Sequence, residues 1–416
     1  MKKTLVALAA LAATSAFAQN AVSLYGALDV GVGNIVSKTG DVNVATRSGA
    51  STSANDSSRW GMTGTEDLGG GMKAEFKIES GIGTNPRSGL TSTSLGGNAA
   101  ASAKDNILAN GTAGGNAFSL DATVLGDREL WLGVTSGALR VNAGWGVTAM
   151  RNLAVQTDAA QSNQVGNVIA HEVGNFRREG VRVDYNLAGG WLVSAGASGN
   201  RQNSAGQTGT ATVAAVPAGE IRSGKGFTYG LQYTQGPINA GYFRDETSSQ
   251  AVAFTSATNT GNVGLPFVPG NDGSFANKTF KTDLLAGSYD AGVAKLFAQY
   301  YSQDAVINES AAGTPGTSAS SGAGKIKGTS IGVRVPFGAL TAYAQALNLK
   351  DQRNSAANTT EDRKFTGSSF GVRYDMSKRT YAYLNSGKIK KDGTAAAPTT
   401  TNYDLKQTAV GLVHSF

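Results

Sequence analysis

The sequence predicts an all-β protein, a 16-stranded antiparallel transmembrane β-barrel. Three observations predict this fold. The chain begins with an export leader, apolar and polar residues alternate with a period of two along most of the remainder, and short and long connections alternate strictly between these segments. Strands that cross a bilayer are apolar only on the face that meets lipid, so the three observations favour one architecture.

The first residues form a targeting signal. Lysines at positions 2 and 3 precede an apolar stretch over residues 5–13, and Ala16-Phe17-Ala18 supplies the small-x-small cleavage site. A membrane-anchor helix would need about 20 apolar residues, more than this stretch offers. We therefore predict a signal peptide over 1–18, cleaved after Ala18, and a single barrel domain over 19–416.

The composition excludes several classes of protein. The formal net charge of the 416 residues is +7, and it falls to +5 without the two leader lysines. Because the basic residues are spread along the chain, binding to nucleic acid is not predicted. The sequence contains no cysteine, 56 glycines and 40% apolar residues. Disulfides therefore cannot stabilise the fold. The moderate apolar content suits strands that are apolar on one face only.

Alternation with period two recurs from one end of the chain to the other. Near the start, Leu28 and Val30 alternate with Asp29 and Gly31, and similar patterns recur up to the last residue. Most segments reach the roughly 9–11 residues that a tilted strand needs to cross a bilayer. We predict strands over 22–35, 58–67, 71–81, 127–136, 137–147, 176–187, 189–200, 222–235, 237–247, 278–290, 292–303, 325–336, 337–349, 363–376, 379–390 and 403–416.

The connections between these strands sort by length. Short ones lie at 68–70, 136–137, 189, 236, 291, 337–338 and 377–378, and most contain turn residues. Short turns on one side and long loops on the other are typical of membrane barrels, and an even strand count lets the sheet close without an edge. The long connections lie at 36–57, 82–126, 148–175, 201–221, 248–277, 304–324, 350–362 and 391–402.

Aromatic residues are placed where a membrane interface favours them. Rings with a polar edge prefer the level of the lipid headgroups. Near the short-turn ends of their strands, the sequence offers Tyr185, Trp191, Tyr381, Tyr403 and Phe416.

The alternation along each strand also predicts which residues line the barrel interior. Arg or Lys on the lipid face at mid-depth costs about 2–4 kcal/mol, so charged residues within the strands should face inward. For any single residue, a merely structural or solvating role is the more frequent explanation, but a cluster is more persuasive. The predicted basic cluster comprises Arg59, Lys73, Lys77, Arg140, Arg178 and Arg182.

Three blocks carry a resemblance to a known family. They are residues 22–29 (VSLYGALD), 58–76 (SRWGMTGTEDLGGGMKAEF) and 410–416 (VGLVHSF). With these blocks in order along its whole length, the chain resembles the trimeric general porins of Gram-negative outer membranes, in particular those of the β-proteobacteria.

The resemblance implies a function and several partners. It implies an outer-membrane location, a homotrimer, and a water-filled channel for passive diffusion of small hydrophilic solutes and ions. It implies that the third long loop, residues 148–175, folds into the lumen and constricts it. It also implies that Phe416 is read by the outer-membrane assembly machinery, and that outer-membrane lipids and lipopolysaccharide surround the barrel.

The resemblance places two acids opposite the basic cluster. If the third long loop constricts the lumen, Asp158 and Glu172 on it would face the basic wall, and a transverse field would cross the narrowest point. From the excess of basic residues we hypothesise a weak preference for anions.

Catalytic and cofactor motifs are not found in the sequence. The two histidines, His171 and His414, have no nucleophile motif beside them, and no spacing typical of metal ligands occurs. We therefore predict neither enzymatic activity nor a cofactor. A secreted β-rich surface adhesin remains an alternative, and an outer-membrane barrel enzyme is a less favoured one.

Overall fold

The computed structural model describes the strands and parts of their connections. The predicted leader, Gln19 and most of the long connections lie outside the described residues. Those described are 21–39, 42–52, 55–83, 119–120, 126, 128–160, 177–198, 202–203, 221–222, 225–249, 277–309, 324–353, 363–392 and 403–416.

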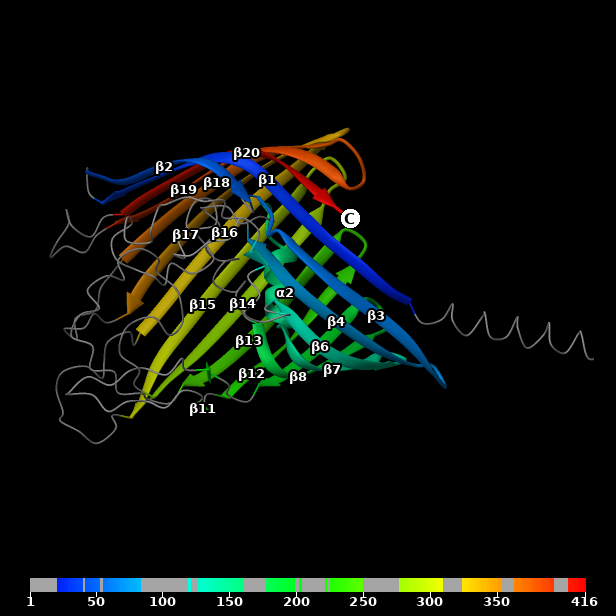
Figure 1. Cartoon of the computed structure of the whole chain (residues 1–416). Helices are drawn as coiled ribbons and strands as arrows, with labels where there is room; N and C mark the ends of the chain where they lie inside the picture. The colour runs from blue at the N-terminus through cyan, green and yellow to red at the C-terminus, as the bar shows by residue number, and fades with distance from the viewer. Residues whose placement is uncertain are drawn as a thin grey trace, which may run out of the picture.

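The strands close into one antiparallel barrel (Figure 1). Each strand of the ring is hydrogen-bonded to the next, and the last pairs with the first, so the predicted fold class is confirmed. Each predicted strand corresponds to one strand of the ring. Within the described residues the ring comprises β1 (Ala21–Thr39), β3 (Arg59–Gly69), β4 (Met72–Gly83), β6 (Glu129–Ser136), β7 (Leu139–Val147), β8 (Arg177–Leu187), β9 (Trp191–Ser198), β12 (Lys225–Gln235), β13 (Ile238–Ser249), β14 (Asn277–Asp290), β15 (Lys295–Glu309), β16 (Gly324–Phe337), β17 (Leu340–Arg353), β18 (Arg363–Asp375), β19 (Thr380–Asp392) and β20 (Tyr403–Ser415).

The wall of the barrel is low on one side and tall on the other. Strands β6, β7, β8 and β9 contain 8, 9, 11 and 8 residues. Strands β14 to β20 contain 13 to 15 residues each. Within the described residues the first arc is therefore lower than the second, and we call them the low wall and the tall wall.

Short turns join the strands at one end of the barrel, as predicted. Six of the seven contain a glycine with positive φ, for example Gly137 at 56° and Gly338 at 64°. A Cβ at either position would meet nothing within 4 Å, so the requirement is conformational rather than steric. Glycine adopts this left-handed backbone readily, which explains why these positions can turn so tightly.

The two faces of each strand differ as the period of two predicts. On β1 the alternate side chains of Val22 and Leu24 are 65% and 63% exposed on the outside, whereas Asp29 on the inner face is fully buried. The exterior is therefore apolar and the interior polar.

Two of the predicted long connections contain regular structure. The connection predicted at 36–57 is wrong in part, because β1 extends to Thr39 and pairs with β2 (Val42–Thr52). The one predicted at 148–175 begins with the helix α2 (Ala149–Gln156). Minor strands within other connections are β5 (Ser119–Leu120), β10 (Gln202–Asn203) and β11 (Ile221–Arg222).

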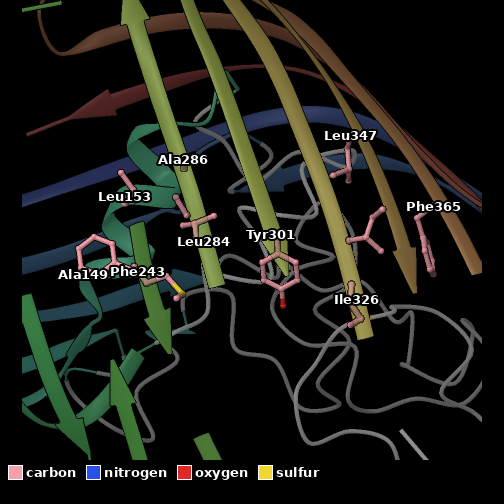
Figure 2. Close-up of a cluster of buried hydrophobic side chains, with 12 residues drawn as sticks. Ala149, Leu153, Phe243, Leu284, Ala286, Tyr301, Ile326, Leu347 and Phe365 are labelled. Carbon is pink, nitrogen blue, oxygen red and sulfur yellow. The ribbon is translucent and has the colours of Figure 1, made fainter. Parts of the chain in front are cut away.

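Helix α2 packs against the inner wall of β12, β13 and β14 (Figures 1 and 2). Its buried Met150 and Leu153 belong to an apolar cluster that includes Phe243 and Leu284, two inward-facing side chains of the wall. The amide of Gln299 on β15 donates to the carbonyl of Ala154 at 2.7 Å. No helix among the described residues is long and apolar enough to span a bilayer.

The C-terminal residue completes the closure of the barrel. The main chains of Phe416 and Gly26 exchange two hydrogen bonds of 3.1 Å. A Cβ at Gly26 would lie 2.3 Å from the ring of Phe416, so the ring lies directly on this glycine. Only a residue without a side chain allows this approach.

Most of the predicted interfacial aromatic residues have exposed rings, but one does not. Tyr185, Trp191 and Phe416 are 46%, 43% and 41% exposed. Tyr381 faces inward instead, where its hydroxyl accepts a hydrogen bond from the Asn55 amide at 3.2 Å, so its assignment to the interface is wrong. The side chain of Tyr403 lies outside the described residues.

Candidate functional site

The six predicted basic residues lie on the inner face of the wall, and most are paired with acids on the same wall. The ammonium of Lys77 lies 2.6 Å from Glu129 and 3.4 Å from Glu79. The guanidinium of Arg59 lies 3.0 Å from Asp56. The wall is therefore a network of opposite charges rather than a uniformly basic surface.

The same pairing continues along β7 and β8. Arg140 lies 3.3 Å from Glu75 and stacks over the ring of Trp131, with 4.7 Å from its guanidinium carbon to the ring centre. Arg182 donates to Asp184 at 2.8 Å. Such pairs hold long side chains against the wall and fix the position of their charges.

Arg178 forms the most buried of these pairs. Its Nη2 lies 2.5 Å from Oδ1 of Asp245, and the carboxylate of Asp245 is 1% exposed. Thr228 donates to the second oxygen of the same carboxylate. Lys73, the sixth residue, lies beside the short turn between β3 and β4, where it is exposed.

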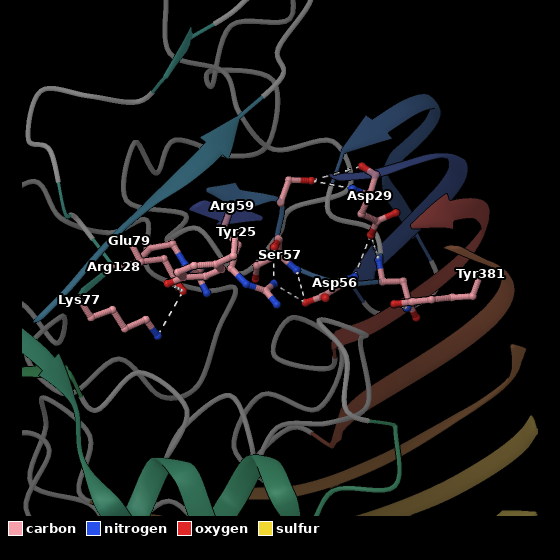
Figure 3. Close-up of polar contacts among 11 residues, drawn as sticks. Tyr25, Asp29, Asp56, Ser57, Arg59, Lys77, Glu79, Arg128 and Tyr381 are labelled. Atoms are coloured by element: carbon pink, nitrogen blue, oxygen red, sulfur yellow. Dashed lines mark hydrogen bonds and ion pairs between the residues drawn. The ribbon is translucent and has the colours of Figure 1, made fainter. Parts of the chain in front are cut away.

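Glu79 is the centre of a larger charged cluster (Figure 3). Arg128 Nε lies 2.6 Å from its carboxylate, and the hydroxyl of Tyr25 donates to it at 2.8 Å. The sequence prediction did not single out Arg128 or Glu129. A signal for Glu129 was present, because it has the opposite parity to the outward-facing Leu130.

Arg151 on α2 extends this cluster into the lumen. Burial lowers the pKa of the Arg151 guanidinium, and the nearby cations Arg177 and Arg128 lower that pKa further, while Glu129 and Glu79 oppose them. Arg151 also lies in the first turn of α2, where the helix dipole disfavours a cation. Arg151 therefore adds positive charge beside Glu79 and Glu129.

The cluster therefore has an excess of cations. We define the Glu79 cluster as four cations, Arg59, Lys77, Arg128 and Arg151, with three carboxylates, Asp56, Glu79 and Glu129. Its formal net charge is +1.

The third long loop was predicted to turn two acids toward the basic cluster, and Asp158, the first of them, has a different position. Asp158 is 2% exposed, and its carboxylate accepts the backbone N–H of Ala160 at 3.2 Å. The neighbouring carbonyl of Ala159 accepts a hydrogen bond from Arg334 on β16 at 2.5 Å. Asp158 is therefore buried beside β16 and does not face the predicted basic wall as an exposed charge. Glu172 lies outside the described residues.

The described residues contain no group of three or more histidines and carboxylates able to hold a metal ion. Phe416 lies at the junction of β20 and β1, and its role as an assembly signal stays a prediction.

Comparison with known proteins gives consistent matches. The profile of the Gram-negative porin family matches residues 4–394. An outer membrane porin protein of Bordetella pertussis is 25% identical and aligns with 99% of this chain and 98% of its own length. Outer membrane porin protein 32 of Delftia acidovorans is 48% identical over 80 residues, which are 19% of this chain and 22% of that protein.

Solved structures show the same fold. The anion-selective porin from Comamonas acidovorans has a TM-score of 0.58 at 19% identity, covering 95% of this chain and all of that one. The trimer form of OmpT from Vibrio cholerae has a TM-score of 0.59 at 13% identity, covering 95% and 99%. At these identities the likeness concerns the fold alone.

The Arg178–Asp245 pair gives a testable prediction for stability. Arg178→Gln leaves a buried carboxylate without its cation, so the free energy of unfolding should fall by about 3–5 kcal/mol. Urea unfolding in phospholipid vesicles measures this change. Lys325→Gln removes a cation from an exposed pair with Asp304 and should cost less than about 1 kcal/mol. Equal losses for the two variants would contradict the prediction, and Asp245→Asn added to Arg178→Gln should recover part of the loss.

Proposed function

The chain belongs to the Gram-negative porin family, and we propose that its pore conducts small hydrophilic solutes with a preference for anions. The channel follows from the family, from relatives named outer membrane porins, and from a closed barrel with a polar inner face. The protein is accordingly an outer-membrane porin. Family members are channels rather than enzymes.

One observation carries the anion preference, the net positive charge of the Glu79 cluster. Paired charges cancel at a distance, but an excess of positive charge inside a narrow lumen attracts anions and repels cations. The Comamonas structure of the same fold is named an anion-selective porin, which adds support from a related protein.

Residues 149–160 support the proposed constriction by the third long loop. They lie on the inner wall from β12 to β17, held by α2 and by the contacts of Ala160 and Ala159 with Gln345 and Arg334. We propose that the loop narrows the lumen at the level of the Glu79 cluster, so that permeating ions pass close to its charges.

Arg151→Gln should lower the anion preference. The substitution reduces the net charge of the cluster by one, so the anion-to-cation permeability ratio should fall severalfold. Reversal potentials in a salt gradient across a planar bilayer measure the ratio. Lys327→Gln removes the same charge from the outer face of β16 and is the control. An unchanged ratio in Arg151→Gln, or a cation preference in the wild type, would contradict the proposal.

We also propose that three copies associate through the low wall. The outward-facing Leu132 and Val181 are 63% and 47% exposed there, and an apolar surface of this kind can be buried between copies. The trimer form of Vibrio cholerae OmpT shows that this fold is compatible with such an assembly.

Leu132→Arg should separate the subunits. A charge in the contact leaves it buried and unpaired, so the oligomer resistant to SDS before heating should be lost. Ile331→Arg, at a 65% exposed position on the tall wall, introduces the same charge and should leave the oligomer intact. Retention of the oligomer in Leu132→Arg, or its loss in both variants, would contradict the assignment of the low wall.

A row of lysines supports contact with anionic lipid at the tall wall. The outward-facing side chains change along each strand, from exposed apolar residues such as Ile331 and Phe370 to lysines in the long-loop half. Among the described residues, Lys325, Lys388 and Lys390 pair with three aspartates, so the lysines of this surface outnumber those acids. We define the lysine row as Lys281, Lys325, Lys327, Lys350, Lys364, Lys388, Lys390 and Lys406.

Lysines next to an apolar band suit the level of lipid headgroups, where their stems lie along the apolar surface and their charges meet phosphate. We propose that the lysine row binds the phosphates of outer-membrane glycolipid, the lipopolysaccharide predicted as a partner.

The lysine row predicts salt-sensitive lipid binding. Lys327→Gln with Lys364→Gln should weaken binding of lipid A to the detergent-solubilised protein by about 1 kcal/mol for each lysine. Titration at low and high salt measures the effect. Lys73→Gln with Lys295→Gln removes the same charge from the inner face and is the control. Equal binding by the two double variants would refute the site.

A further inference from the structure

The barrel wall contains an outsized bulge between β2 and β3. On β1, Val30 pairs with Thr52 of β2, and Ala27 pairs with Arg59 of β3. Six positions of the chain separate Thr52 from Arg59, whereas only Leu28 and Asp29 separate their two partners on β1. Bulges of one extra residue already re-aim side chains at barrel rims, and a larger one must leave the plane of the sheet.

The described part of this bulge, Asn55–Ser58, turns into the lumen. We call it the inner turn. The amide of Asn55 donates to the hydroxyl of Tyr381 at 3.2 Å, and the amide of Asn385 donates to the Asn55 side-chain oxygen at 3.1 Å. Tyr381 and Asn385 are inward-facing residues of β19, so the inner turn lies against the interior of the barrel.

Asp29 is the anchor of the inner turn. Its side chain is fully buried, and one carboxylate oxygen accepts the backbone N–H groups of Asn55 and Asp56 at 2.6 and 2.8 Å. The other oxygen accepts the hydroxyl of Tyr383 at 2.7 Å. The Asp29 backbone N–H, which faces the bulge, donates to the Ser58 hydroxyl at 2.9 Å. A buried carboxylate with three donors fixes the turn in one position.

The inner turn brings an acid to the edge of the Glu79 cluster. The Asp56 carboxylate pairs with Arg59 at 3.0 Å and remains 32% exposed, while Arg59 also donates to the carbonyl of Ser57 at 2.7 Å. Arg59 interacts electrostatically with Glu79, and Arg151 on α2 does the same. Arg59 therefore lies between the inner turn and Glu79 (Figure 3), and Glu79 in turn interacts electrostatically with Arg151 of α2.

We propose that the inner turn is a second, fixed constriction element of the channel, with Asp56 as a selectivity-determining residue and Asp29 as the residue that positions it. The lumen is then narrowed both from the α2 side and from the β1–β19 side. The acid of the inner turn offsets part of the positive charge that α2 contributes. The inference rests on the proposed channel function.

Asp56→Asn is the direct test of selectivity. The side chain is partly exposed and keeps its size, so the fold should be retained. Loss of the carboxylate raises the net charge of the cluster to +2, and the anion-to-cation permeability ratio should rise at least twofold over the wild type. Asp375→Asn removes an inward-facing acid that pairs with Arg373 near a short turn, and it should change the ratio less.

Asp29→Asn tests the positioning role. An amide cannot replace both carboxylate oxygens as acceptors, so the inner turn should lose its single position. The expected result is a higher or fluctuating single-channel conductance with the barrel still folded, judged by its heat-dependent migration in SDS. Asn55→Ala removes two of the anchoring contacts but leaves Asp29 in place, and it should cause a milder change in the same direction.

These outcomes are separable from the proposed anion preference, because every variant is compared with the wild type in the same membrane. A wild-type channel that prefers cations would overturn that preference, yet Asp56→Asn should still shift the ratio toward anions. Equal shifts of the anion-to-cation permeability ratio in Asp56→Asn and Asp375→Asn would overturn the inference. It is also overturned if the folded Asp29→Asn and Asn55→Ala channels both conduct as steadily as the wild type.

Discussion

The closed ladder of main-chain hydrogen bonds is the constraint on which the rest of the structure depends. A bilayer core offers no water to an unpaired N–H or carbonyl, so the sheet must return to its own first strand. The pairing of β20 with β1, with Phe416 lying on Gly26, meets this condition. Closure in turn separates an apolar exterior from a polar interior, and a charged residue at the depth of the bilayer core must find its partners on the inner wall.

The ladder also explains which features the sequence could predict. Strand positions and faces follow from a period of two that lipid imposes on every strand, so Lys77 and Arg182 could be assigned to the interior from their neighbours alone. Partners could not be assigned in this way. Asp245 is 67 positions from Arg178, and only the pairing of strands through the ring brings the two together. Tyr381 was misassigned because its place near a turn was given more weight than its parity, which it shares with the inward-facing Tyr383.

Helix α2 and the inner turn, the two segments that leave the barrel wall, were the features least predictable from the sequence. Helix α2 carries Met150 and Leu153 at helical spacing, but eight residues are too short a segment for that pattern to stand out from a loop. The inner turn has no periodicity, and its place depends on a carboxylate of β1 and on side chains of β19. Both segments are held in place by residues distant in the chain, so the local sequence carries little information about their positions.

A wall of paired charges has a consequence for selectivity. If each base of the wall were neutralised by its own acid, the lumen would be polar but would not distinguish the sign of an ion. Discrimination must then come from places where bases and acids differ in number. The Glu79 cluster is such a place, because α2 adds the charge of Arg151 to a group of charges that the wall has already nearly balanced. The inner turn acts in the opposite sense through Asp56. The sign and strength of selection therefore depend on two inserted segments, while the strands that carry most of the charge mainly hold those segments in place.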